Sequence, residues 1–364
     1  MSLVSESTTS SMRSSRSWDR RKITALPLLV VLLVSLACGR NSQGAAATVG
    51  STRWSQDALT IEVAEPSVFP GGALVVGVGP GDTRLMLWEP TNDELKEVGT
   101  WGATGHWLHR VAADFDDETL VGSMGLSGDE WSLWAGKPDA QVLLSHTAAG
   151  FAFDPNDPTR IAWLDVRARP PELIVNDLSA MGVAQRVSIS GVEWLAGWTD
   201  AGIAMTGRDG SSVLTPEGDV QRLDITLAAW SDEGTGVAIV DNSVQFVDVD
   251  LSSHALELPE LDDESVPLSA SWLPDRNRFV VSSFIVSPEG TTSTLRLITP
   301  NGRSGASITF DGWKAGYAVE WGQWLAVSGG SGKDDGNWLR LWNPDDDTIV
   351  SVLSSDQITP IGQL

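Results

Sequence analysis

A unit of about 42 residues recurs along this chain, and it limits the possible folds more than any other feature. Its clearest copy, residues 228–258, contains short apolar runs separated by turns rich in Gly, Asp, Asn and Ser. Each run is too short for a helix. Val, Ile, Phe and Trp between such breaks are typical of strands joined by tight turns. The pattern therefore predicts a four-stranded meander.

Seven copies of this meander can be aligned on their second strand. An aromatic residue and a turn precede most of these strands, and several third strands end at turns that contain Pro, which favours reversal of the chain. The aligned positions are Leu74, Leu120, Ile161, Ile203, Val237, Phe279 and Leu325. A period of about 42 residues is typical of propeller blades. We therefore predict an all-β fold, a seven-bladed β-propeller of four-stranded antiparallel blades, over residues 58–364.

Two segments carry a family resemblance. Ala229-Trp230-Ser231-Asp232-Glu233-Gly234 and Ser271-Trp272-Leu273-Pro274-Asp275 are similar to the blade signature of WD40-like repeats of the TolB type. The resemblance covers about residues 58–364 and implies the propeller fold. It says little about function, because one fold hosts many functions.

The sequence leaves two alternatives for closing the ring. Residues 54–63 have the pattern of a strand and can supply the first strand of the first blade or pair with the last blade. Residues 358–364 can also supply part of the strand pairing that closes the ring. We expect most of the 17 Trp residues to pack between blades, and Trp101, Trp107, Trp131 and Trp338, near predicted loops, to be the candidates for exposure.

The first 37 residues have the pattern of an export signal. Basic residues end at Lys22, and residues 23–37 are an uncharged apolar run, short for a membrane-spanning helix. Leu36-Ala37-Cys38-Gly39 resembles a bacterial lipobox, which implies lipid attachment, as with palmitate, at Cys38. The alternatives are cleavage by an ordinary signal peptidase and an uncleaved anchor. No other Cys occurs, so the chain forms no internal disulfide although export would permit one.

Residues 38–57 are mostly small and polar, and they are predicted to form a flexible tether. This gives a signal peptide at 1–37, a tether at 38–57 and the propeller at 58–364. The predicted location is the outer face of the cell membrane, with the domain held as a lipoprotein.

The charge excludes some partners. The chain has a net charge of −24, and residues 38–364 carry 19 Lys and Arg against 46 Asp and Glu. Such a surface repels phosphate backbones, so nucleic acid is not an expected partner. We expect a monomer.

The sequence offers no recognisable catalytic or cofactor motif. The four His residues lack the grouping of a zinc site, and no serine elbow or phosphate loop is complete. The acidic clusters lack the spacing of a calcium loop. The sequence therefore predicts no metal, no cofactor and no catalytic residue, and Cys38 is the one site residue.

We interpret the chain as an extracytoplasmic, lipid-anchored binding scaffold for a protein, peptide or glycan partner. The alternative is a propeller hydrolase or lyase whose carboxylates meet at the central channel. A third possibility is an assembly factor similar to TolB, but that family has a helical domain before its propeller and residues 39–57 are too short for one.

Overall fold

The computed structural model describes residues 52–363, except residues 58, 64–68, 70, 80–83, 101–105, 113–119, 128–129, 138–139, 181, 241–242, 248–252, 256–265, 289 and 331–336. The predicted signal peptide and Cys38 lie outside the described residues. Where the chain is described, it is almost entirely β, with one short 3-10 helix, η1 (Pro90–Asn92). None of the described residues forms a helix long and apolar enough to cross a membrane.

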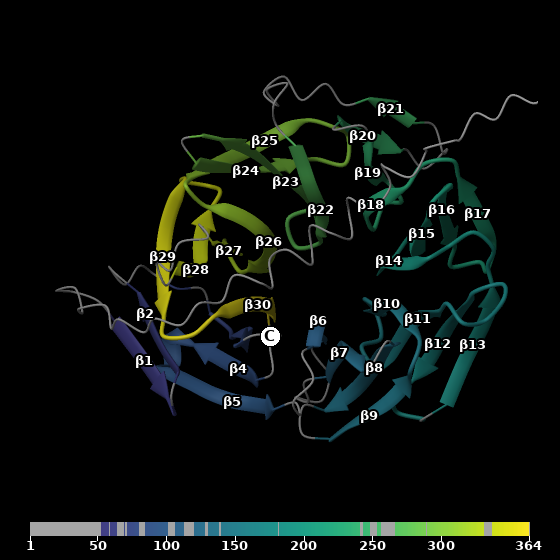
Figure 1. Ribbon diagram of the computed structural model, residues 1–364, viewed down its shortest axis with the longest axis horizontal. Helices are drawn as coiled ribbons and strands as arrows, with labels where there is room; N and C mark the ends of the chain where they lie inside the picture. The colour runs from purple at the N-terminus through teal and green to yellow at the C-terminus, as the bar shows by residue number, and fades with distance from the viewer. Residues whose placement is uncertain are drawn as a thin grey trace, which may run out of the picture. The chain divides into compact units, whose positions relative to one another are not determined.

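Seven antiparallel sheets form the seven blades of a β-propeller (Figure 1), which confirms the predicted fold class. From the innermost strand outward, blade 1 contains β30 (Ile358–Gln363), β3 (Leu74–Val78), β4 (Arg84–Glu89) and β5 (Glu94–Thr100). Blade 2 contains β6 (His106–Ala112), β7 (Leu120–Ser127), β8 (Glu130–Lys137) and β9 (Ala140–Ser145). Blade 3 contains β10 (Ala148–Phe153), β11 (Arg160–Asp165), β12 (Glu172–Asp177) and β13 (Gly182–Ser188).

The next three blades have the same order. Blade 4 contains β14 (Trp194–Thr199), β15 (Gly202–Gly207), β16 (Gly210–Leu214) and β17 (Val220–Leu223). Blade 5 contains β18 (Leu227–Trp230), β19 (Gly236–Val240), β20 (Ser243–Val247) and β21 (Ser253–Ala255). Blade 6 contains β22 (Val266–Leu273), β23 (Arg278–Ser287), β24 (Gly290–Ile298) and β25 (Ser304–Asp311). All seven strands used to align the repeats are the second strands of their blades, as predicted.

Blade 7 has six strands because the first hairpin of the chain extends it. It contains β26 (Lys314–Trp321), β27 (Trp324–Gly330), β28 (Asn337–Asn343) and β29 (Thr348–Ser354), followed outward by β2 (Leu59–Val63) and β1 (Thr52–Gln56). In β2, Ile61 pairs with Ser354 and Val63 pairs with Val352. Of the two alternatives for residues 54–63, the structure has pairing with the last blade. Strand β1 lies in the last part of the segment predicted as tether.

The other end of the chain closes the ring on its inner side. Strand β30 pairs with β3, from Leu74 opposite Gln363 to Val78 opposite Ile358. Blade 1 therefore takes its innermost strand from the C-terminal segment and its other three from the N-terminal half. Both ends of the described chain contribute to closure, at the outer edge of blade 7 and at the inner edge of blade 1.

The core is divided among the spaces between blades. The described buried apolar residues form seven clusters, and each cluster joins two neighbouring blades. Leu273 of blade 6 and Trp342 of blade 7, for example, belong to one cluster, whereas Val75 of blade 1 and Val121 of blade 2 belong to another. Each sheet thus buries its faces against its neighbours, because a single meander is too thin to have an interior of its own.

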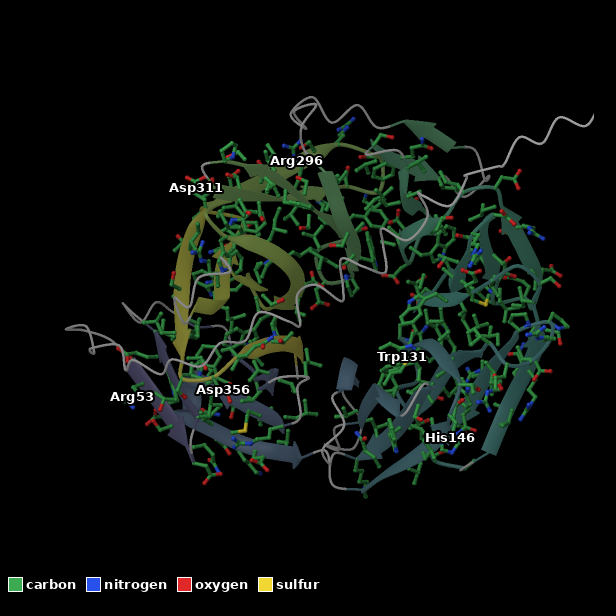
Figure 2. All side chains as sticks on the ribbon, viewed as in Figure 1. Arg53, Trp131, His146, Arg296, Asp311 and Asp356 are labelled. Atoms are coloured by element: carbon green, nitrogen blue, oxygen red, sulfur yellow. The ribbon has the colours of Figure 1, made fainter. Side chains whose placement is uncertain are left out.

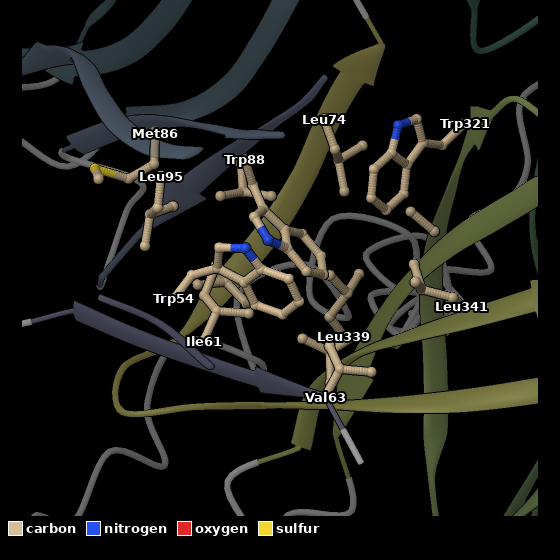
Figure 3. Packing of buried hydrophobic residues seen from close by; sticks show 14 of the residues in the cluster. Trp54, Ile61, Val63, Leu74, Met86, Trp88, Leu95, Trp321, Leu339 and Leu341 are labelled. Carbon is tan, nitrogen blue, oxygen red and sulfur yellow. The ribbon is translucent and has the colours of Figure 1, made fainter. Parts of the chain in front are cut away.

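Aromatic rings fill the contact between the last blade and the first (Figure 3). Trp88 of β4 lies with its ring centroid 5.3 Å from that of Trp321 of β26 and 5.3 Å from that of Trp54 of β1. Phe69 is 5.8 Å from both Trp54 and Trp88. Edge-to-face and tilted ring contacts of this kind add to the area that is buried. We call these four residues the aromatic seam.

The aromatic seam predicts that truncation of Trp88 weakens the whole ring. Trp88 is fully buried, so Trp88→Ala should lower the free energy of unfolding by about 3–5 kcal/mol. Thermal and denaturant unfolding followed by circular dichroism would measure the change. Trp194→Ala is the matched control, because Trp194 is 40% exposed and its loss should cost much less. Equal effects of the two substitutions would contradict the role of the seam.

Candidate functional site

The innermost strand of each blade faces the centre of the ring (Figure 1). The sequences of these strands contain few charged residues. The seven strands are β30, β6, β10, β14, β18, β22 and β26, and their residues are mostly small or apolar. The one carboxylate within them is Glu320, near the end of β26. A hydrolase of the carboxylate-pair type needs two such groups that face one substrate. The described inner strands hold this one carboxylate.

Close approach of the inner strands explains their small residues. At Gly150 of β10 the backbone has φ +74°, and a Cβ atom would come within 2.4 Å of the carbonyl oxygen of Leu195 in β14. A side chain here would therefore separate blades 3 and 4. At this point the backbones of blades 3 and 4 pack directly against each other.

The Glu320 carboxylate of blade 7 forms hydrogen bonds with blade 6. Its carboxylate accepts hydrogen bonds from the backbone N–H of Asp275 at 3.2 Å and of Arg276 at 3.0 Å, both in the first turn of blade 6. The Arg276 guanidinium also lies 3.9 Å away and donates to the carbonyl of Gly322. Burial raises the pKa of Glu320 to about 7, with a further contribution from Asp275, while the two backbone N–H groups and Arg276 oppose the shift. The side chain ties blade 6 to blade 7.

The turns between the first and second strands of neighbouring blades lie on the same rim, and polar contacts join them. The Asn156 side chain of blade 3 donates to Asp200 of blade 4 at 2.7 Å. The Trp272 indole of blade 6 donates to Asp232 of blade 5 at 2.8 Å. In an antiparallel meander the connections between strands three and four fall at the same end as these turns, and the remaining connections fall at the opposite end. We call the end with the turns after strands one and three of each blade the first rim. The opposite end is the second rim.

The two rims differ in charge. The described connections of the first rim hold twelve acidic residues, Asp93, Asp154, Asp157, Asp200, Glu217, Asp219, Asp232, Glu233, Asp275, Asp345, Asp346 and Asp347, and two basic ones, Arg276 and Arg303. Those of the second rim, with the turn between β1 and β2, hold five acidic residues, Asp57, Glu193, Asp209, Asp224 and Asp356, and three basic ones, Arg167, Arg169 and Arg208. The first rim is thus the more strongly anionic of the two where the chain is described.

A groove lies between blades 2 and 3, next to the outermost strand of blade 2. Its volume is about 330 Å³, at the lower end of the range for small-ligand sites. Apolar residues of β9 form one wall, and the other comes from β11, β12 and β13. Its residues include Leu143, Trp163, Asp165, Asn176, Val183 and Arg186. The wall from β9 is therefore uncharged, whereas the wall from blade 3 also carries Asp165 and Arg186.

The structure describes the environment of only some of the residues that the sequence singled out. Cys38 and Trp101 lie outside the described residues, and so do the side chains of Trp107 and Trp338. Trp131 of β8 is half-buried and packs against the cluster between blades 2 and 3 (Figure 2). Trp194, which the sequence did not single out, is the more exposed of the two. The sequence could have indicated this exposure, because the aromatic residue of blade 4 that aligns with those of the other blades is Trp198 and not Trp194.

No catalytic or metal-binding group assembles in the described part of the chain. His146 places Nδ1 3.5 Å from Oγ of Ser132, but Ser132 is 1% exposed and out of reach of a substrate. No three potential metal ligands among His, Cys, Asp and Glu come together where the structure describes them. The candidate functional surface is therefore the pair of rims with the adjoining groove.

Comparisons with known proteins give the fold. No family model matches the sequence, and no curated protein is similar to it in sequence. Among solved structures, one of two prolyl endopeptidases studied for inter-domain dynamics has 14% identity and a TM-score of 0.51, over 83% of this chain and 50% of that one. A functionally unknown protein from Desulfotomaculum acetoxidans has 10% identity and a TM-score of 0.50, over 79% of this chain and 99% of that one. TolB from Acinetobacter baumannii has 12% identity and a TM-score of 0.48, over 82% and 67%.

Glu320 predicts a specific pH dependence of stability. Its pKa is raised in the folded protein, from 4.5 to about 7, so its contribution is complete below pH 4.5 and is lost as the pH rises through 7. Relative to Glu320→Gln, which does not titrate, the unmodified protein should lose on the order of 3 kcal/mol between pH 4.5 and pH 8. Denaturant unfolding at several pH values would measure the difference. Parallel pH profiles of the two proteins would show that Glu320 does not titrate differently on folding.

Proposed function

We propose that this chain is an exported, lipid-anchored propeller that acts as a binding scaffold for a protein, peptide or glycan partner. The observation that carries the proposal is the single carboxylate of the inner strands, which is engaged between blades 6 and 7. Because the inner strands are mostly small or apolar in sequence, we place the surface for recognition on the rims. Turns and loops held on a rigid scaffold are frequent sites of binding.

The proposed anchor is lipid attached at Cys38. Support comes from the sequence, because an apolar run at residues 23–37 ends next to Cys38, and small and polar residues follow it. Such a spacer allows the propeller to stand away from the membrane surface on which it is held. The proposed location is the outer face of the cell membrane.

The anchor predicts that Cys38 carries the lipid. A bacterial host that expresses the full chain and is fed an alkyne-tagged fatty acid should label the protein, and Cys38→Ala should abolish the label. Ser42→Ala keeps the cysteine, lies after the lipobox and is the matched control. Export of the unlabelled native chain, with an N-terminus that mass spectrometry places at an ordinary cleavage site, would contradict lipid attachment.

The scaffold role predicts contacts at the rims in living cells. A photo-crosslinking amino acid at Val166 of the second rim or at Asp346 of the first should give a discrete adduct. The same residue at Gln185, on the outermost strand of blade 3, should give none or far less. Absence of adducts at both rims, together with turnover of a glycan or ester panel by the purified chain, would favour the alternative, a propeller hydrolase or lyase.

A further inference from the structure

The basic residues in the described connections of the second rim are concentrated in one sector. The three that its described connections hold are Arg167 and Arg169, between β11 and β12 of blade 3, and Arg208, between β15 and β16 of blade 4. These two blades are neighbours in the ring (Figure 1). With Glu193 and Asp209, the described connections of this sector hold three basic and two acidic residues, whereas the whole chain has a net charge of −24.

Two exposed apolar side chains lie in the same sector. Val166 is 42% exposed and Trp194 is 40% exposed. Both lie beside the beginning of β10, since the Val166 N–H donates to the carbonyl of Thr147 and the Trp194 ring lies against Gly150. A larger residue at Gly150 would displace that ring, so the backbone of blade 3 helps to hold Trp194 in place. We call Val166, Arg167, Arg169, Trp194 and Arg208 the blade 3–4 patch.

Two arginines of the patch, Arg169 and Arg208, are exposed. Arg208 is 84% exposed on its side chain and lies 3.0 Å from Glu193, the residue before Trp194. Arg169 is exposed and forms no ion pair with any described residue. Exposed pairs such as Arg208–Glu193 add little to stability, so partner carboxylates can compete for these guanidinium groups at low cost.

We infer that the blade 3–4 patch binds an acidic segment of a protein partner, with one apolar side chain of that segment against Trp194. Interfaces are enriched in aromatic residues and Arg, and their strongest contacts use Trp and Arg. The described carboxylates of the first rim disfavour such a segment there, whereas the exposed guanidinium groups of the patch attract it. The inference rests on the proposed scaffold function and names the chemistry of the partner.

A binding measurement with a defined probe tests the patch. The probe is a fluorescent peptide of alternating Glu and Leu, and its counterpart of alternating Lys and Leu is the control. Fluorescence anisotropy with the full chain in a neutral detergent should show preferential binding of the Glu peptide, weakened by added salt. Preference for the Lys peptide, or binding that salt does not change, would overturn the inference.

Substitutions locate the binding. Arg169→Glu and Trp194→Ala should each weaken binding of the Glu peptide by about tenfold or more. Arg303→Glu places the same charge change on an exposed arginine of the first rim and should leave the affinity unchanged. Circular dichroism would establish that each variant is folded. Equal affinities of all variants would overturn the assignment to this patch.

Two further outcomes separate this inference from the scaffold function. Adducts in cells from Asp346 but not from Val166 would overturn the patch and leave a scaffold that binds through its first rim. Binding to vesicles of phosphatidylglycerol that Arg169→Glu abolishes, without binding of the Glu peptide, would replace the protein partner by an anionic membrane surface. Adducts from Val166 that Arg169→Glu removes would support the inference.

Discussion

Burial of apolar surface between neighbouring blades is the interaction on which the rest of this structure depends. Each blade is a single sheet with apolar residues on both faces, and neither face can be covered from within the blade. The seven described clusters accordingly lie between blades. Stability is therefore shared around the ring, and the first and last blades need each other as much as any other pair does.

Closure of the ring follows from this need. The contact between blades 7 and 1 is made by segments almost 300 residues apart, and strand pairing at two places reinforces it. Strand β30 completes blade 1 from the inside, and β2 adds to blade 7 from the outside. Trp54, which lies on β1, contacts Trp88 of blade 1 across the same seam. A long-range contact of this kind has a high entropic cost, and the aromatic seam supplies a large apolar area to offset it.

The order of strands in the meander also determines on which rim a charged turn residue lies. In a four-stranded antiparallel blade, alternate turns fall at opposite ends, so the choice of turn residues is a choice of rim. Asp in the turns after the first and third strands places negative charge on one rim in blade after blade. The arginines between β11 and β12 and between β15 and β16 fall on the other. Among the described residues, the two rims therefore carry different charge.

The repeat alone determined the architecture. A fixed period, with an aromatic and a turn before an apolar strand, placed Leu74, Ile161, Val237 and Leu325 in second strands of their blades, because local turn chemistry and strand propensity act within each unit. Tertiary structure decided what depends on contacts between units. Residues 52–63 and 358–363 have similar strand patterns, and their partners follow from packing across the seam. The exposure of Trp194 and the burial of Glu320 were likewise set by neighbouring blades, since neither local sequence records what lies against it.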